Sequence, residues 1–62
     1  MTVLELINRN DDYTVETELQ VCYNGKWMGM YSASQLVHVY GLCEVISFSR
    51  RQVIIIGRRN DA

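Results

Sequence analysis

The sequence lacks the residue patterns of the common catalytic and metal-binding sites. Its two cysteines, Cys22 and Cys43, do not form a CxxC pair, and its one histidine, His38, cannot complete a Cys/His zinc set. No serine stands in a nucleophile elbow, and no glycine-rich loop could hold a phosphate. We therefore expect no enzymatic activity and no cofactor, and we interpret both cysteines as reduced, buried or half-buried thiols rather than a disulfide.

A cluster of acidic residues in the first half of the chain also lacks the spacing of an EF-hand. The cluster consists of Asp11, Asp12, Glu16 and Glu18. It could hold a cation or repel nucleic acid, but a solvated loop is the more common role of such a cluster. His38 is also expected to be solvated, because a lone histidine on the outer side of a helix is more often solvated than catalytic.

Long apolar runs are missing as well. The longest, Val53 to Ile56, is far too short to cross a bilayer, and no basic segment followed by an apolar core opens the chain, so we expect a soluble, cytoplasmic protein. The 62 residues form one domain. A chain of this size buries only roughly 60% of its unfolded surface, so contact with a partner or a second copy would add to a narrow stability margin.

The net charge of -1 hides an asymmetry along the chain. Residues 1–49 carry six acidic residues against Arg9 and Lys26, which gives -4, whereas residues 50–62 carry four arginines against Asp61, which gives +3. The arginine-rich segment is therefore the one candidate for an anion-binding surface.

Two capping boxes predict two short helices. Thr2 with Glu5 indicates a helix from residue 3 that ends in the polar stretch 8–12, and Ser32 with Gln35 indicates a second helix from residue 33. We expect Gly41 to follow the second helix as a left-handed residue. The apolar stripes of the two helices consist of Val3, Leu4, Leu6 and Ile7, and of Ala33, Leu36, Val37 and Tyr40.

Between the helices, apolar residues alternate with polar ones, and Asn24-Gly25 predicts a type I′ hairpin turn. The predicted register pairs Tyr23 with Lys26, Cys22 with Trp27, Val21 with Met28, and Leu19 with Met30. It places on one face Leu19, Val21, Tyr23, Met28 and Met30, and on the other Gln20, Cys22, Trp27, Gly29 and Tyr31. A second strand pair is expected from residues 43–49 and 53–56, joined by a turn at residues 49–52.

The expected fold is therefore α+β, in the order α-β-β-α-β-β. Two short amphipathic helices and a four-stranded antiparallel sheet most simply form a two-layer sandwich with both helices on one face. The other face of the sheet then has no cover within the chain. With Ile46, Phe48, Val53 and Ile55 turned to the helices, the uncovered face receives Val45, Ile54, Ile56, Cys22, Trp27 and Tyr31.

Exposed apolar patches of this kind usually mark an interface. The functional interpretation is a protein-binding or self-association surface with aromatic anchors. The structural interpretation is that strand order or register differs and these residues are ordinary core; the sequence leaves both open. The candidate partner-binding residues are Tyr23, Trp27, Tyr31, Ile54 and Ile56.

The arginines bracket the last strand as two pairs, Arg50 with Arg51 and Arg58 with Arg59. Such pairs could bind the phosphates of a nucleic acid. More commonly, such charges protect an edge strand against aggregation. Because the chain is slightly acidic overall, we expect nucleic acid not to be the partner.

Short segments spread over residues 2–57 resemble a loose group of short phage and prophage proteins. These segments are TVLELI, NGKW, YSASQL, EVISFS and QVIIIG. The resemblance implies a small protein made by a mobile element inside a bacterial cell, and it brings no active-site residues with it.

Three hypotheses follow for the function. The first is an interaction protein that blocks a site on a host protein, such as an inhibitor of host defence of the anti-CRISPR type. The second is a structural homo-oligomer whose uncovered faces pack together, and the third is a nucleic-acid-binding regulator that uses the arginines.

Overall fold

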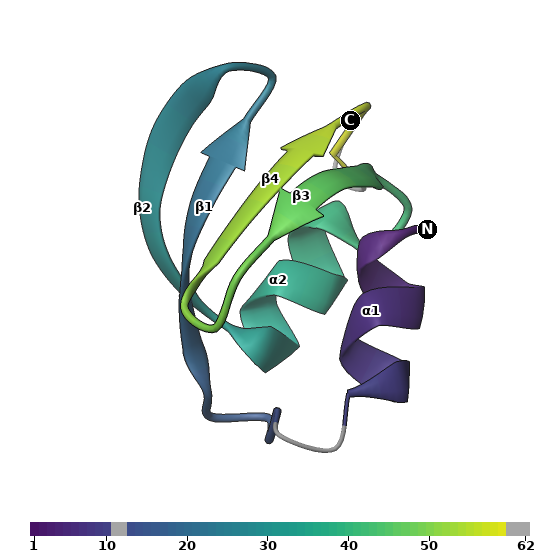
Figure 1. Cartoon of the computed structure of the whole chain (residues 1–62), viewed down its shortest axis with the longest axis vertical. Coiled ribbons are helices and arrows are strands. Elements are labelled where there is room, and N and C mark those ends of the chain that lie inside the picture. The colour runs from purple at the N-terminus through teal and green to yellow at the C-terminus, as the bar shows by residue number, and fades with distance from the viewer. Residues whose placement is uncertain (11–12, 60–62) are drawn as a thin grey trace.

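A computed structural model describes residues 1–10 and 13–59 of the chain (Figure 1). Its elements follow the predicted order of two helices and four strands, so the α+β class is confirmed. They are α1 (Val3–Arg9), β1 (Glu18–Tyr23), β2 (Lys26–Ser32), α2 (Ala33–Tyr40), β3 (Glu44–Phe48) and β4 (Gln52–Ile56). Of the predicted acidic cluster, Asp11 and Asp12 lie outside the described residues.

The strands form one sheet in the order β2-β1-β4-β3. The prediction of a fully antiparallel sheet is wrong, because β4 pairs in parallel with β1, with Val21 opposite Val53. The two hairpins are each encoded by a local turn, but the order in which they join is decided by burial. The central position suits β4, whose Val53 and Ile55 are fully buried under the helices.

The β1–β2 hairpin has the predicted turn but not the whole predicted register. Asn24 (φ 51°) and Gly25 (φ 85°) adopt the positive φ values of a type I′ turn, and Cys22 faces Trp27. A β-bulge beside Val21 and Cys22 then shifts the ladder, so that Val21 faces Gly29 instead of Met28. Beyond the bulge every residue of β2 is turned to the opposite side from the prediction.

A second bulge lies between Val45 and Ser47 in the β3–β4 hairpin. Val45 faces the buried Ile55 and packs against the core, so its predicted place on the uncovered face is wrong. Ile46, predicted to face the helices, is 60% exposed. The predicted turn at residues 49–52 is present, closed by a bond from Ser49 N to Gln52 O (2.9 Å).

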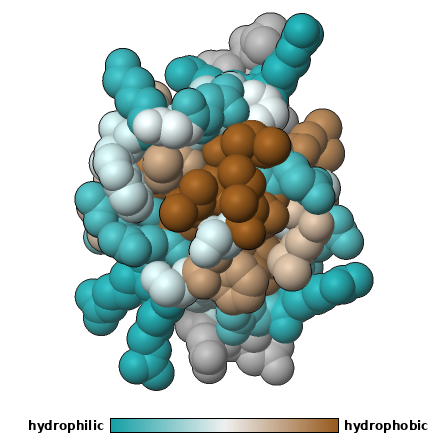
Figure 2. All heavy atoms as spheres, turned by 45° about the horizontal axis from the view of Figure 1, so that its top comes forward, coloured by the Kyte–Doolittle hydropathy of each residue, from teal (hydrophilic) through white to brown (hydrophobic). Residues whose placement is uncertain are grey.

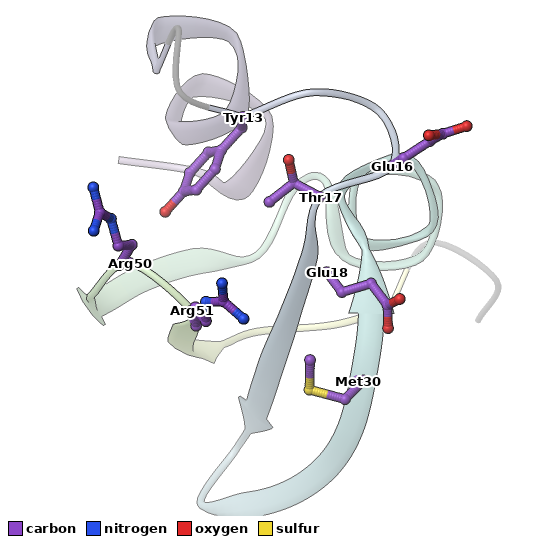
Figure 3. A pocket seen from close by; sticks show the side chains of 7 residues that line it. All are labelled: Tyr13, Glu16, Thr17, Glu18, Met30, Arg50 and Arg51. Atoms are coloured by element: carbon purple, nitrogen blue, oxygen red, sulfur yellow. The ribbon is translucent and has the colours of Figure 1, made fainter.

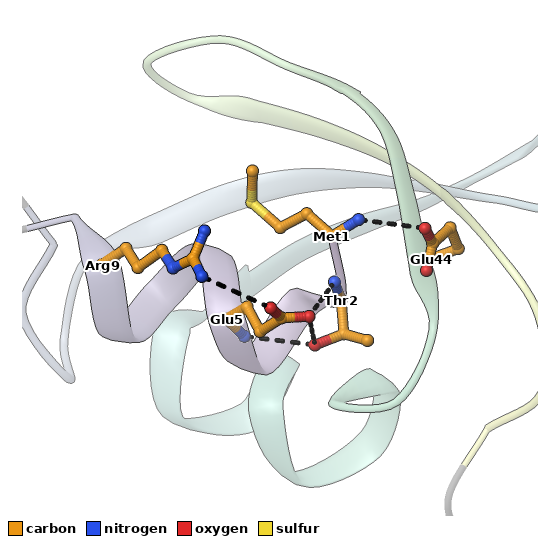
Figure 4. A network of polar contacts seen from close by, with 5 residues as sticks. All are labelled: Met1, Thr2, Glu5, Arg9 and Glu44. Atoms are coloured by element: carbon orange, nitrogen blue, oxygen red, sulfur yellow. Dashed lines mark hydrogen bonds and ion pairs between the residues drawn. The ribbon is translucent and has the colours of Figure 1, made fainter.

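Both capping boxes are present, and that of α1 belongs to a polar network (Figure 4). Thr2 Oγ1 accepts a hydrogen bond from Glu5 N (3.2 Å), and Glu5 Oε1 accepts one from Thr2 N (3.0 Å). The terminal amino group of Met1 pairs with Glu44 Oε1 at 3.0 Å. These contacts fix the start of α1 beside β3.

The prediction that Gly41 is left-handed is wrong. Its φ of -54° and ψ of -33° are right-handed, and its carbonyl accepts a hydrogen bond from Leu4 N at 3.0 Å. Gly41 is buried, so the end of α2 is stabilised by contact with α1 rather than by a left-handed residue.

The core lies between the sheet and the two helices, which cover the same face of the sheet (Figure 1). The predicted helix stripes supply much of it, although Leu4 is 40% exposed. The buried cluster consists of Val3, Leu6, Leu19, Val21, Leu36, Tyr40, Cys43, Val53 and Ile55. The two cysteines are free and buried, as predicted.

Candidate protein-binding surface

The face of the sheet turned away from α1 and α2 is called here the outer face. Strand pairing places Trp27, Cys22 and Ile54 side by side across β2, β1 and β4, and Ser47 of β3 completes the row. Ile56 follows Ile54 two residues later and so points to the same face. Met30 pairs with Gln20, two residues before Cys22, and so lies on this face as well. The apolar residues of this face are called the outer patch, which consists of Cys22, Trp27, Met30, Ile54 and Ile56.

Much of the outer patch is exposed. The exposed fractions are 51% for Trp27, 54% for Met30 and 45% for Ile56. In the part of the chain that the structure describes, no helix or loop is layered over this face. Figure 2 shows a continuous hydrophobic area near the middle of the molecule, with hydrophilic side chains around it.

Cys22 shows how closely the side chains of the outer patch lie together. It is only 7% exposed although it lies on the face without helices. The reason is that Trp27 and Ile54 stand beside it on the two neighbouring strands. The outer patch is therefore a packed apolar layer with a largely buried centre, not a set of isolated side chains.

The outer patch borders polar and charged side chains, and Met30 shares a pocket with Glu16, Glu18, Arg50 and Arg51. Gln20 lies between Met30 and Gln52, and Gln52 Nε2 donates a hydrogen bond to Gln20 Oε1 at 3.5 Å. Glu44, opposite Ile56, is a charged residue at this border. An apolar centre within a polar rim is the usual composition of a protein interface.

Tyr23 and Tyr31, two of the predicted anchors, lie on the helix side of the sheet. Both pack against Tyr40 of α2, with ring centroids 4.9 Å and 5.4 Å away. The prediction that Tyr31 lies on the uncovered face is wrong, because the bulge in β2 turns it toward the core. The hydroxyl groups of Tyr40 and Tyr31 form a hydrogen bond of 3.3 Å. Burial, together with this bond, raises the pKa of Tyr40 to about 12.

The four arginines lie at opposite ends of β4, as the sequence predicts. Arg50 and Arg51 line a pocket of about 650 Å³ (Figure 3). The same pocket is lined by Tyr13, Glu16, Thr17, Glu18 and Met30. Because two carboxylates stand across the pocket from these arginines, binding of a phosphate backbone there is disfavoured.

The structure therefore brings together three of the five predicted partner-binding residues, Trp27, Ile54 and Ile56. It adds Met30, which was predicted to share a face with Leu19 and Val21. The missed signal is Gly29, whose φ of 94° belongs to the bulge region. A glycine inside a strand often marks such an irregularity, and a shifted register would have placed Met30 outside.

Other kinds of site have less support. Within residues 1–10 and 13–59, no group of three or more histidine, cysteine, aspartate or glutamate side chains could hold a metal ion. In the same residues, no helix has the length and apolar character needed to cross a membrane.

Comparison with known proteins adds no further assignment: no family model matches the chain, and no curated protein or solved structure matches it significantly.

Proposed function

We propose that the chain is a non-enzymatic protein-interaction module that binds a partner protein through the outer patch. The observation that carries this proposal is the half-exposed Trp27 on the same sheet face as Ile54 and Ile56, with Cys22 between Trp27 and Ile54 and no covering layer among the described residues. Soluble monomers seldom leave such a contiguous apolar layer in water. A partner that covers it would remove this surface from solvent and so gain free energy.

Trp27 is the proposed anchor of this interface. A tryptophan that buries a large rigid ring at the centre of a contact commonly contributes about 2 kcal/mol or more to binding. Cys22 stands beside it on the neighbouring strand β1, so one side of the Trp27 side chain already has a neighbour before a partner covers the other side.

The mechanism is occlusion, in which the module covers a functional surface of its partner. The resemblance to phage and prophage proteins suggests a bacterial host protein, such as a component of host defence.

Capture of partners from a bacterial host lysate tests the proposal. Wild-type protein is compared with Trp27→Ala and with Ile54→Glu, which places a charge at the centre of the outer patch. Leu42→Glu is the matched control, because Leu42 is 74% exposed and lies outside the sheet. Circular dichroism confirms that each variant is folded.

The expected result is a specific partner retained by wild type and by Leu42→Glu but lost by both outer-patch variants. Recovery of the same proteins at equal yield by all four baits would overturn the proposal.

A further inference from the structure

The pocket of about 650 Å³ beside Met30 carries charges of both signs. Arg50 and Arg51 form one side of it, called here the arginine wall. Glu16 and Glu18 form the opposite side, called the glutamate wall (Figure 3). All four charged residues are exposed, and among the described residues no ion pair joins the two walls. The walls therefore face each other without neutralising each other by direct contact.

The lining between the two walls is less polar. Figure 3 shows Thr17 and Met30 in this position, and the ring of Tyr13 beside Arg50. Met30 is 54% exposed, and its flexible thioether can adapt to an apolar group that lies on it. A ligand that reaches from one wall to the other would therefore pass over apolar atoms.

Hydrogen bonds hold the two walls in place. Arg51 O accepts a hydrogen bond from Gln20 N at 2.7 Å, which ties the arginine wall to β1, the strand that carries Glu18. The hydroxyl of Tyr13 donates to Ser49 O at 3.3 Å and joins the same two segments again. The spacing of the walls is thus set by the fold before a ligand binds, which lowers the entropy cost of binding.

Ligands with one kind of charge fit this pocket poorly. An anion would meet the glutamate wall, and a metal ion or organic cation would meet the arginine wall. A neutral ligand would displace water from charged groups without replacing its hydrogen bonds. A ligand with one charge of each sign is complementary to both walls.

We propose that the pocket binds a bipolar ligand, in which a carboxylate and an ammonium group are joined by a short apolar chain. The carboxylate accepts hydrogen bonds from Arg50 and Arg51, whose planar guanidinium groups match its geometry. The ammonium group donates to Glu16 and Glu18, and the chain between the two charges lies over Met30. Free ω-amino acids have this chemistry, and so does a lysine at the C-terminus of a peptide.

The proposal goes beyond the proposed function and does not depend on it. Met30 belongs to both the pocket and the outer patch, but the charged groups that select the ligand lie outside the outer patch. Ile54→Glu should therefore remove the binding of a partner protein and leave the bipolar ligand bound. Failure of one proposal is thus distinguishable from failure of the other.

Heteronuclear NMR titration tests the proposal with three probes that have the same number of carbon atoms. ε-Aminocaproate carries both charges, caproate lacks the ammonium group, and hexylamine lacks the carboxylate. Because the charges of the pocket are solvated, we expect ε-aminocaproate to shift the amide signals of Thr17 and Arg51 with a dissociation constant of about 1 mM. Each probe with a single charge should bind at least about fivefold more weakly.

An acetylated peptide that ends in lysine distinguishes the two sources of this chemistry. Its C-terminal amide, which lacks the carboxylate, is the control. Tighter binding of the peptide than of ε-aminocaproate would assign the pocket to a chain end, and the reverse would assign it to a free small molecule. Equal binding of the peptide and its amide would overturn the proposal.

Substitutions with a matched control complete the test. Arg51→Gln and Glu18→Gln each remove one charge and should each weaken the binding of ε-aminocaproate at least about threefold. Arg58→Gln, beyond the other end of β4, makes the same change in net charge as Arg51→Gln and should leave the affinity unchanged. The amide spectrum of each variant shows whether it is folded.

Three further results would each overturn the proposal. The first is equal affinity for ε-aminocaproate and the two probes with a single charge. The second is a wild type without saturable shifts at about 20 mM ε-aminocaproate. The third is an affinity that is unchanged in both folded pocket variants.

Discussion

Cys22 lies opposite Ile54 across the parallel β1–β4 pair, and Trp27 lies on its other side across the antiparallel β1–β2 pair. This thiol is thus shielded by two side chains of the outer patch and not by a helix. Cys43, in contrast, is 1% exposed, and its Sγ donates to Arg58 O at 3.2 Å. Burial raises the pKa of the Cys43 thiol.

The difference in shielding predicts how the two thiols react. Trp27→Ala should speed alkylation of Cys22 severalfold and leave Cys43 unchanged, because only Cys22 loses a neighbour. Pulsed alkylation followed by peptide mass spectrometry measures both sites in one sample. Leu42→Ala provides a control substitution on the exposed surface. An unchanged rate at Cys22 would show that Trp27 does not cover it.

The hydroxyl groups of Tyr31 and Tyr40 form a second testable pair. Tyr40→Phe should lower the free energy of unfolding by about 1 kcal/mol, since one hydrogen bond is lost and the ring is kept. Tyr31→Phe should cost about the same, and the double variant should cost less than the sum of the two. Urea unfolding measures all four proteins, and strict additivity would contradict a shared bond.

Tyr40 also predicts a loss of stability in alkali. Its pKa is raised from 10.0 to about 12 in the folded state, so the folded state holds its proton more tightly than the unfolded state. The stability from this group is complete below pH 10 and is lost as the pH rises to about 12. Thermal melts across that range should show a decline that is smaller in Tyr40→Phe.

Asn24 has two roles that substitution can separate. It has a positive φ of 51° and it bonds the backbone of Gly57 twice. Asn24→Gly keeps the turn geometry and loses only the bonds, whereas Asn24→Ala loses both. We expect a loss of about 1 kcal/mol for the first and about 2 kcal/mol for the second. Urea unfolding measures both variants. If Asn24→Gly and Asn24→Ala lost the same free energy of unfolding, the positive φ at this position would contribute nothing to stability.

The capping box of α1 predicts an acid-sensitive contact. Hydrogen bonds from the backbone and side chain of Thr2 hold the pKa of Glu5 below 4.5. The stability that this carboxylate contributes is therefore present above that pH and is lost as the pH falls through its folded-state pKa. Thr2→Ala should lower stability by about 1 kcal/mol near neutral pH and reduce the acid dependence, which thermal melts at several pH values would show.

Local chemistry explains what the sequence predicted correctly. Capping boxes at Thr2 and Ser32 and the Asn24-Gly25 turn act over a few residues, so they define the helix starts and the first hairpin without reference to the rest of the chain. The β-branched run from Val53 to Ile56 likewise predicted a strand, and the expected place of Val53 and Ile55 in the core is confirmed. Part of the candidate site was also predicted correctly. Trp27 and Ile54 lie on the expected face because neither is displaced by the two bulges.

Only the tertiary structure decided the remaining features. Beyond a bulge, every side chain of the strand points to the opposite face of the sheet. The bulge in β2 therefore places Met30 on the outer face, where the sequence predicted Tyr31. The place of β4 beside β1 depends on burial under both helices, which no turn or cap encodes. The amino-acid sequence by itself thus determined which elements form and where the two helices begin. Packing between distant segments decided the sheet order, the outer patch and the pocket between the glutamate and arginine walls, because these depend on contacts between residues far apart in the chain.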